Sequence, residues 1–291
     1  MEKKCRNCPR KCLCDRENGQ YGVCGVPEKF MVSRIAAHKW EEPPISGTHG
    51  SGTIFFTGCS LRCVFCQNRV ISREGHGRLI EDEELAQSIQ ELQRQGVHNI
   101  NFVTPTHYAA RLAGFLQKEK SQIKVPVVYN CGGYEDVETL HTLSGLVDIY
   151  LPDMKYVSGE LSARYSAAPD YFPVAMAALR EMFLQVGRPV FDENGLMRRG
   201  MIVRHLVLPG CRADSMAVLR ALREVFDPTD IRLSIMSQYT PDFAMDSPYK
   251  NLHRRVTTFE YQSVLDLAAD LGFVGYSQHP SAASAAFTPD F

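Results

Sequence analysis

The sequence predicts an α/β fold, an open (βα)6 partial TIM barrel with a small Cys-rich extension at its N-terminus. Six short apolar runs alternate along the chain with helical patterns. This alternation indicates a parallel sheet with right-handed crossovers. No further strand–helix pair is left over to close a barrel of eight strands, so the sheet is expected to stay open.

The six predicted strands are rich in β-branched and aromatic residues, as buried strands are. Between them, apolar residues recur at helical spacing, for example at Leu85, Ile89 and Leu92. An Asn194-Gly195 pair before the fifth strand predicts a hairpin turn. The strands are expected at 51–56, 100–103, 125–129, 147–151, 201–208 and 231–236. The helices are expected at 82–95, 108–118, 136–143, in a longer stretch that ends at about 186, and at 214–226 and 258–271.

The chain divides into four predicted segments. Residues 1–27 form a Cys-rich metal-binding arm, and residues 28–50 form a connector that contains a rigid Pro43-Pro44 turn. Residues 51–280 form the partial barrel. The small, polar tail at 281–291 is expected to fray, with capping of the open barrel as the alternative.

Composition excludes several classes of function. Lys plus Arg number 32 and Asp plus Glu 33, so no basic field indicates a nucleic-acid partner. No apolar run approaches the ~20 residues that cross a bilayer, and the N-terminus carries no apolar export signal. We therefore expect a cytoplasmic protein without a membrane partner, in which ten cysteines indicate metal or redox chemistry rather than disulfides.

Three cysteines stand in one loop after the first strand, with C-x3-C-x2-C spacing at Cys59, Cys63 and Cys66. Iron–sulfur clusters are usually held by four thiolates. Three thiolates in one loop would leave one iron open to a substrate. The alternative is half of a zinc site, because closely spaced cysteines are common zinc ligands.

The N-terminal arm predicts a second metal site. It has few large apolar residues and cannot fold by burial alone, and a metal supplies the missing stability in small Cys-rich units. Structural zinc and a second iron–sulfur cluster fit equally well, and a disulfide or unligated arm is the alternative. The expected ligands are Cys5, Cys8, Cys12 and Cys24, with Cys14 to spare.

Polar residues follow or interrupt the other strands. Ligands of open α/β sheets bind at the carboxyl ends of the strands, and one of Arg204 and His205 in the fifth strand should point to the interior. An ordinary ion pair at the edge of the core is the alternative for each residue. The candidates are Thr104, Thr106, Asn130, Asp153, Lys155, Arg204 and Gln238.

The loop from Gly58 to Asn68, with aromatic Phe65 before the last cysteine, resembles the signature of radical S-adenosylmethionine (SAM) enzymes. The wider string is similar to the branch that contains pyruvate formate-lyase activating enzymes, and the resemblance covers about residues 50–280. It implies a partial barrel, a [4Fe–4S] cluster held by the three loop cysteines, and SAM bound to the open iron.

The resemblance also implies roles for individual residues. Lys155, within an Asp-x-Lys pair, would meet the SAM carboxylate or ribose, Asn130 would lie near the ribose, and Arg204 near the carboxylate. Such enzymes normally carry Gly-Gly-Glu at the second strand end to receive the SAM amino group. This chain has Thr104-Pro105-Thr106 instead, so a threonine hydroxyl or carbonyl would accept the amine.

The function expected from the resemblance is reductive cleavage of SAM to a 5′-deoxyadenosyl radical that takes a hydrogen atom from a substrate. Activation of a glycyl radical enzyme is the expected use, with flavodoxin or ferredoxin as electron donor. Modification of a peptide or small molecule is the alternative within this class. A non-catalytic zinc or iron–sulfur interaction module is the alternative from another class.

Overall fold

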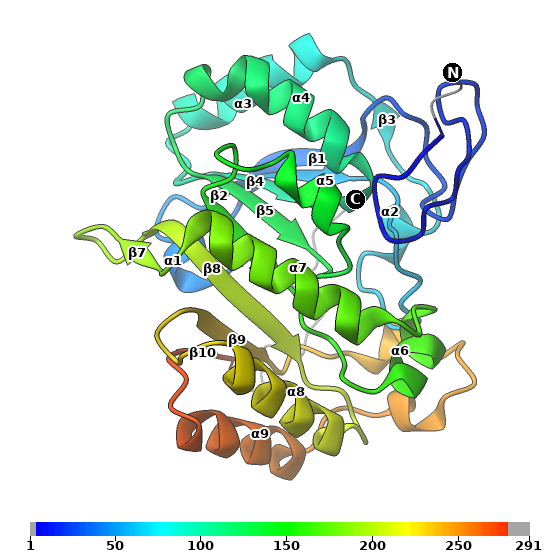
Figure 1. Cartoon of the computed structure of the whole chain (residues 1–291), viewed down its shortest axis with the longest axis vertical. Helices are drawn as coiled ribbons and strands as arrows, with labels where there is room; N and C mark the ends of the chain where they lie inside the picture. Colours follow the sequence, from blue (N-terminus) through cyan, green and yellow to red (C-terminus); the bar gives the residue numbers. More distant parts are fainter. Residues whose placement is uncertain (1–3, 279–291) are drawn as a thin grey trace.

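A computed structural model describes residues 4–278 of the chain. Its central feature is one sheet in which six parallel strands follow each other in the order β9-β8-β6-β5-β4-β2 (Figure 1). The predicted α/β fold with an open sheet is confirmed. The strands are β2 (Ser51–Phe56), β4 (Ile100–Val103), β5 (Val127–Cys131), β6 (Ile149–Pro152), β8 (Met197–Leu206) and β9 (Arg232–Met236).

Four further strands extend this sheet. β10 (Gly275–Ser277) adds a parallel strand beside β9 that the sequence did not predict. β1 (Met31–His38) pairs antiparallel with β2, and β3 (Arg78–Leu79) pairs with β1. β7 (Val190–Phe191) pairs antiparallel with β8, which confirms the predicted hairpin. Within the described residues the sheet ends at β10 and β3, so it remains open.

Longer helices cover the outer face of the sheet, whereas α6 (Gly159–Ser166) lies beyond the carboxyl ends of the strands (Figure 1). The predicted helical stretch before residue 186 is divided in two, because Ala167 adopts a left-handed conformation (φ 51°). No helix in residues 4–278 is both long enough and apolar enough to cross a membrane. The helices are α3 (Asp82–Arg94), α4 (Ala109–Glu119), α5 (Val137–His141), α6 (Gly159–Ser166), α7 (Tyr171–Val186), α8 (Arg212–Val225) and α9 (Thr258–Asp270).

Short helical turns lie in the connections. They are α1 (Pro43–Ser46), α2 (Arg69–Ser72) and the 3-10 turns η1 (Thr106–Tyr108), η2 (Lys120–Gln122), η3 (Pro241–Ala244) and η4 (Lys250–His253). The connector predicted at 28–50 thus contains β1 and α1, and the Pro43-Pro44 turn is the start of α1, where proline is favoured. The predicted tail at 281–291 lies outside the described residues.

α1 closes the end of the lumen, the space enclosed by the inner face of the sheet. Ile45 of α1 is fully buried against the inner-face residues Val128, Ile149 and Ile202. The amide of Asn99, which directly precedes β4, donates to the Ile45 carbonyl (2.7 Å). α1 therefore sits at the amino ends of the strands, and the carboxyl ends are left for the candidate site.

Candidate active site

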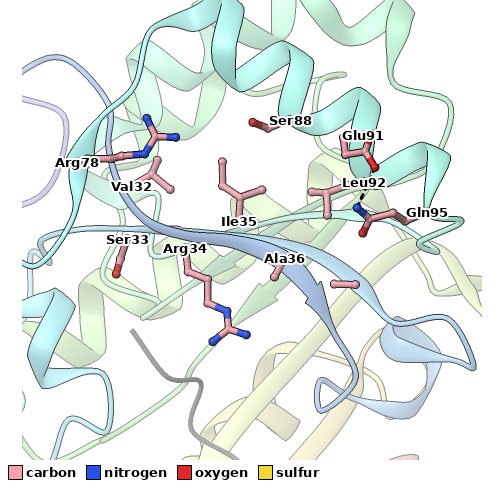
Figure 2. A pocket seen from close by; sticks show the side chains of 11 residues that line it. Val32, Ser33, Arg34, Ile35, Ala36, Arg78, Ser88, Glu91, Leu92 and Gln95 are labelled. Carbon is pink, nitrogen blue, oxygen red and sulfur yellow. Dashed lines mark hydrogen bonds between the residues drawn. The ribbon is translucent and has the colours of Figure 1, made fainter.

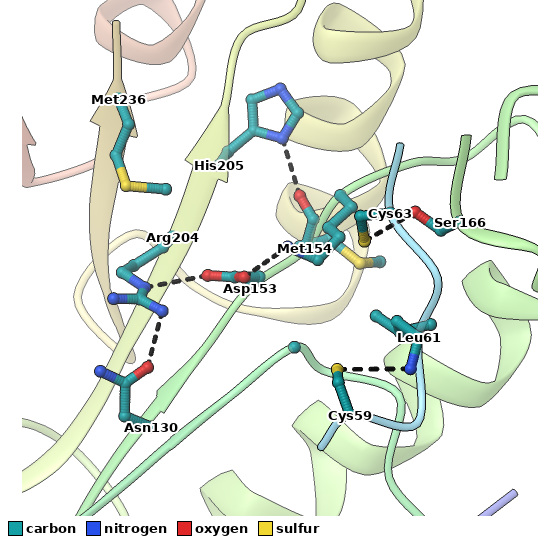
Figure 3. Close-up of polar contacts among 12 residues, drawn as sticks. Cys59, Leu61, Cys63, Asn130, Asp153, Met154, Ser166, Arg204, His205 and Met236 are labelled. Carbon is teal, nitrogen blue, oxygen red and sulfur yellow. Dashed lines mark hydrogen bonds and ion pairs between the residues drawn. The ribbon is translucent and has the colours of Figure 1, made fainter. Parts of the chain in front are cut away.

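The cysteine loop, residues 57–68, follows the carboxyl end of β2. Each of its three sulfurs has a hydrogen-bonding group beside it, and Figure 3 shows those of Cys59 and Cys63. Such groups stabilise sulfur that carries negative charge, as a metal-bound thiolate does. The contacts are Cys59 Sγ with Leu61 N (3.4 Å), Cys63 Sγ with Ser166 Oγ (3.0 Å) and Cys66 Sγ with Ser72 Oγ (3.3 Å).

The electrostatics of the loop suit a bound cation. Burial raises the pKa of the Cys59 and Cys66 thiols, and the neighbouring loop cysteines raise it further. Lys155 acts in the opposite direction on both. Burial of both sulfurs beside a third cysteine therefore opposes negative charge on them unless a metal is bound. The donor set therefore fits an iron cluster that supplies the missing positive charge.

Backbone and side-chain contacts fix the cysteine loop between two distant strand ends. The backbone N–H groups of Arg62 and Val64 donate to the carbonyls of Ser166 (3.2 Å) and Tyr165 (2.8 Å) in α6, which follows β6. On the other side, Gln67 Nε2 donates to the Gln238 carbonyl (2.9 Å) after β9. The loop thus spans the carboxyl edge of the sheet.

Four predicted residues, Asn130, Asp153, Lys155 and Arg204, form one connected polar network at the strand ends, called here the Arg204 network; Figure 3 labels three of them, Asn130, Asp153 and Arg204. Arg204 donates from Nε to Asp153 Oδ1 (2.9 Å) and from Nη2 to Asn130 Oδ1 (2.7 Å). Lys155 Nζ donates to Asp153 Oδ2 (2.5 Å). Burial alone would raise the pKa of Asp153, but Arg204 and Lys155 together hold it below its ordinary value. The network is therefore ionised and preorganised.

Arg204 and His205 point to opposite faces of β8, as strand alternation requires. Arg204 faces the lumen, whereas His205 Nδ1 contacts the Met154 carbonyl (2.7 Å) (Figure 3). Burial lowers the pKa of His205 to about 4. His205 is thus a neutral residue outside the Arg204 network.

The two threonines after β4 separate in space. Thr104 adopts a left-handed backbone (φ 58°), and its N–H donates to the Asn130 carbonyl (2.8 Å). A β-branched residue is strained there, and such strain clusters at functional sites. Thr106 instead donates its hydroxyl to Glu135 Oε1 (2.6 Å), beside Tyr129 on the helix-covered face. The structure therefore does not bring Thr106 to the Arg204 network.

Gln238 lies at the edge of the site rather than in the Arg204 network. Its side-chain Oε1 accepts from Gln278 (2.9 Å), and its carbonyl holds Gln67 of the cysteine loop. Its position is consistent with support of the loop.

Sequence reasoning missed Glu41 and Glu42 of the connector. Arg204 Nη1 lies 3.5 Å from Glu41 Oε2, and Glu41 Oε1 accepts from Asn101 and Asn130 (both 3.3 Å). No local pattern distinguishes these carboxylates, because Glu-Glu-Pro-Pro also describes an exposed turn. Asn101, on the inner face of β4, could have indicated them, because a polar residue within an apolar strand needs a polar partner.

The N-terminal arm packs on the cysteine loop. Arg10 donates to the carbonyls of Ser60 (2.8 Å) in the loop and of Ala167 (2.6 Å) beyond α6. In the reverse direction, Arg62 of the loop donates to the Val23 carbonyl of the arm. These contacts join the arm to the site at its cysteine loop.

The arm's five cysteines influence one another electrostatically. Burial raises the pKa of Cys8 to about 12, and Cys24 and Cys5 add to the rise. Burial also raises the pKa of Cys14, with Cys5, Cys12 and Cys24 contributing. No three His, Cys, Asp or Glu side chains of residues 4–278 converge as the ligands of a single ion do. The predicted ligands Cys5, Cys8, Cys12 and Cys24 thus stay a prediction.

Two surface hollows lie apart from the Arg204 network. A groove of about 440 Å³ separates β1 from α3, where Leu92 and Gln95 face Ile35 (Figure 2). A second hollow of about 500 Å³ lies between the arm and the helices α5 and α7. Neither contains a residue of the Arg204 network or the cysteine loop.

Comparison with known proteins identifies the family. Residues 53–189 match the model of the radical SAM superfamily. The chain is also 31% identical over 281 residues to the uncharacterized protein MJ0674 of Methanocaldococcus jannaschii, covering 91% of this chain and 74% of that protein. The chain belongs to the radical SAM superfamily.

Solved structures agree at the level of the fold. A spore photoproduct lyase variant is 12% identical, with a TM-score of 0.51, over 85% of this chain and 79% of that protein. Streptococcus suis SuiB bound to S-adenosylmethionine is 12% identical with a TM-score of 0.48. The likeness to SuiB covers 79% of this chain but only 46% of SuiB, so this chain spans less than half of that protein.

Membership of the superfamily makes this chain a radical SAM enzyme, with a [4Fe–4S] cluster and SAM. The comparisons do not single out the branch of pyruvate formate-lyase activating enzymes. The comparisons give neither the subtype of radical SAM enzyme nor the residues that bind each cofactor.

Proposed function

We propose that this enzyme generates a 5′-deoxyadenosyl radical at a cluster held by Cys59, Cys63 and Cys66, and uses it to take a hydrogen atom from a glycine of a partner protein. When bound, the cluster supplies one electron to the sulfonium of SAM, which breaks into methionine and the adenosyl radical. The observation that carries this proposal is the position of Lys155, which joins the Arg204 network and also acts electrostatically on the loop cysteines.

The protein's own residues hold and orient SAM. Lys155 and Arg204 provide donors for its carboxylate and ribose, and Asn130 provides an amide at the same strand ends. Thr104 presents its strained backbone beside Asn130 and is our candidate for the amine contact. Buried side chains around the Arg204 network exclude water, which preserves a reactive intermediate.

We further propose a second metal site in the arm, bound by Cys5, Cys8, Cys12 and Cys24. Two observations support this site: the thiols interact electrostatically, and the arm contains few large apolar residues. A cytoplasmic flavodoxin or ferredoxin is the proposed reductant. The arm borders the cysteine loop, so it also lies beside the point where an electron must arrive.

The proposed partner substrate is a protein rather than a small molecule. An open sheet leaves room for a protein loop to approach the strand ends, as glycyl radical activation needs. Modification of a small molecule needs only the lumen. The experiment must therefore identify the hydrogen donor as well as the cleavage reaction.

Anaerobically reconstituted enzyme would be reduced with dithionite in the presence of SAM, and 5′-deoxyadenosine would be measured. The reaction would be repeated with extract from cells grown on deuterated glycine, separated into macromolecular and small-molecule fractions. We expect deuterium in 5′-deoxyadenosine with the macromolecular fraction. Transfer from the small-molecule fraction alone would refute glycyl radical activation, and absence of the nucleoside from a fully loaded enzyme would refute SAM cleavage.

A further inference from the structure

Two consecutive carboxylates enter the lumen from its amino end. The Ser46 hydroxyl contacts both the N–H (2.9 Å) and the carbonyl (3.3 Å) of Glu41, which fixes the backbone just before α1. From there Glu41 reaches Asn101, Asn130 and Arg204. Glu42 follows it and lies close enough to Arg204 and to Ser234 of β9 to interact with both. The pair thus spans the lumen between β4 and β9.

This region holds acceptors that lack donors. Glu42 is 8% exposed and Asn101 is fully buried, yet Glu42 Oε2 and Asn101 Oδ1 have no hydrogen-bond partner among the described residues. Buried polar atoms of this kind are rare, because each costs free energy when it is left unpaired. Both atoms are acceptors, so the group that satisfies them must carry N–H or O–H donors.

The charges of the lumen indicate a cation. Around Arg204, the described residues place three carboxylates, those of Glu41, Glu42 and Asp153, against two cations, Arg204 itself and Lys155. Asp153 already engages both cations. Burial raises the pKa of both glutamates, and Arg204 only partly opposes this rise. An added cation would offset the buried negative charge that this imbalance leaves.

We propose that Glu41, Glu42 and Asn101, the lumen floor, bind a positively charged primary amino group of the molecule that donates the hydrogen atom. An ammonium ion offers three N–H donors and one positive charge, which matches both the unpaired acceptors and the excess of carboxylates. This inference rests on the proposed radical function. The same chemistry has two sources, a lysine side chain of a protein or a small free amine.

The test compares Glu42→Gln and Glu41→Gln with wild type on anaerobically reconstituted enzyme saturated with SAM. Glu135→Gln is the matched control, because Glu135 is also a buried glutamate but faces Thr106 and Tyr129 on the helix-covered face. Butylammonium and tetramethylammonium serve as probes of equal charge, of which only butylammonium has N–H donors. Binding is read as stabilisation against thermal unfolding.

Butylammonium is expected to stabilise wild type and Glu135→Gln, and tetramethylammonium to do so much less. Each floor variant should weaken butylammonium binding about 10- to 100-fold, the usual range for a lost charge-assisted hydrogen bond. Equal binding of butylammonium to wild type and both floor variants would overturn the inference. If Glu42→Gln does not fold, Asn101→Ala gives the same comparison.

Two further measurements distinguish a lysine side chain from a small free amine. N-acetyl-glycyl-lysine amide and its norleucine analogue are titrated in the same way, and a preference for lysine that Glu42→Gln abolishes supports a protein donor. If butylammonium binds but this peptide does not, the floor serves a small amine. The last measurement is a titration with SAM itself. If Glu42→Gln loses as much affinity for SAM as it loses for butylammonium, the lumen floor binds SAM. That result would overturn the assignment to the substrate.

Different results would refute the lumen floor as an amine site and the radical function of the enzyme. Wild-type enzyme that forms 5′-deoxyadenosine but shows no Glu42-dependent amine binding refutes the lumen floor alone. Amine binding that depends on Glu42, in an enzyme that forms no 5′-deoxyadenosine, refutes the radical function and with it the assignment to a hydrogen donor.

Discussion

The two cysteine-rich regions of this enzyme have different physical support. The cysteine loop is held by backbone hydrogen bonds to α6 and by Gln67, and it begins at a fully buried strand. The arm has no regular helix or strand in its described residues, 4–27, and it depends on side chains such as Arg10 and Arg16. The loop is thus positioned by the sheet and α6, whereas the arm is positioned by its own turns and by side-chain contacts with the barrel.

From this contrast we expect different responses to loss of the proposed metals. The cysteine loop, which is fixed by the sheet, should keep its shape without iron and lose only its chemistry. The arm, which contributes few residues to the core, should lose its fold without the metal proposed for it. Four experiments test these expectations.

The largest effect is expected from Cys59→Ala. Removal of one of three thiolates leaves the cluster with too few ligands, so bound loop iron and 5′-deoxyadenosine should both fall below detection. Iron content, visible absorbance and nucleoside formation measure this. An intact cluster in Cys59→Ala would contradict the assignment, and Cys211→Ala, which changes a cysteine outside both regions, is the control.

Cys24→Ser should affect the arm and spare the loop. We expect loss of the arm's metal and rapid proteolysis within residues 4–27, while the loop cluster remains. Metal analysis and limited proteolysis with mass spectrometry check this. Unchanged metal content and unchanged cleavage would show that Cys24 is no ligand.

Arg10→Met tests the junction between the two regions. The variant loses hydrogen bonds to Ser60 and Ala167 and the contact of its guanidinium with the Tyr134 ring (5.2 Å). Together these should destabilise the docked arm by ~1–3 kcal/mol. Hydrogen exchange of residues 4–27 should rise, and exchange in β5 should not. Equal exchange in wild type and variant would mean that Arg10 does not hold the arm.

The last prediction concerns Glu135, whose effect appears only as a pH dependence and which lies behind β5 near Cys8. Burial raises the pKa of Glu135 from 4.5 to about 7. The folded enzyme therefore binds a proton that the unfolded chain releases, so stability should fall as pH rises from about 4.5 to about 7, by at most ~3 kcal/mol. Chemical denaturation of wild type and Glu135→Gln at several pH values should show a shallower slope in the variant. Parallel slopes would contradict this pKa.

Much of the fold was predictable because its signals are local. The six main strands and the Asn194-Gly195 hairpin follow from short runs of residues that need no knowledge of their neighbours. β10 was missed because three residues without alternation carry no such signal. The single predicted helix before residue 186 divides at Ala167, whose left-handed backbone no propensity indicates.

The candidate site was predictable where strand ends define it and not elsewhere. The rule for carboxyl ends brought Asn130, Asp153 and Lys155 together with Arg204. The same rule could not foresee that η1 turns Thr106 toward Glu135, since one 3-10 turn reverses the direction of a side chain. Nor could it find Glu41 and Glu42, because residues of a connector enter the lumen only through tertiary packing.

Gly58 illustrates how closely the arm and the cysteine loop are fitted. A Cβ atom at this position would lie 2.6 Å from the Cys24 carbonyl oxygen, and its backbone is left-handed (φ 86°). Any larger residue would push against the arm's main chain one position before Cys59. The absence of one methyl group therefore lets the arm and the cysteine loop pack directly against each other, so a substitution at Gly58 would require compensating changes in both segments.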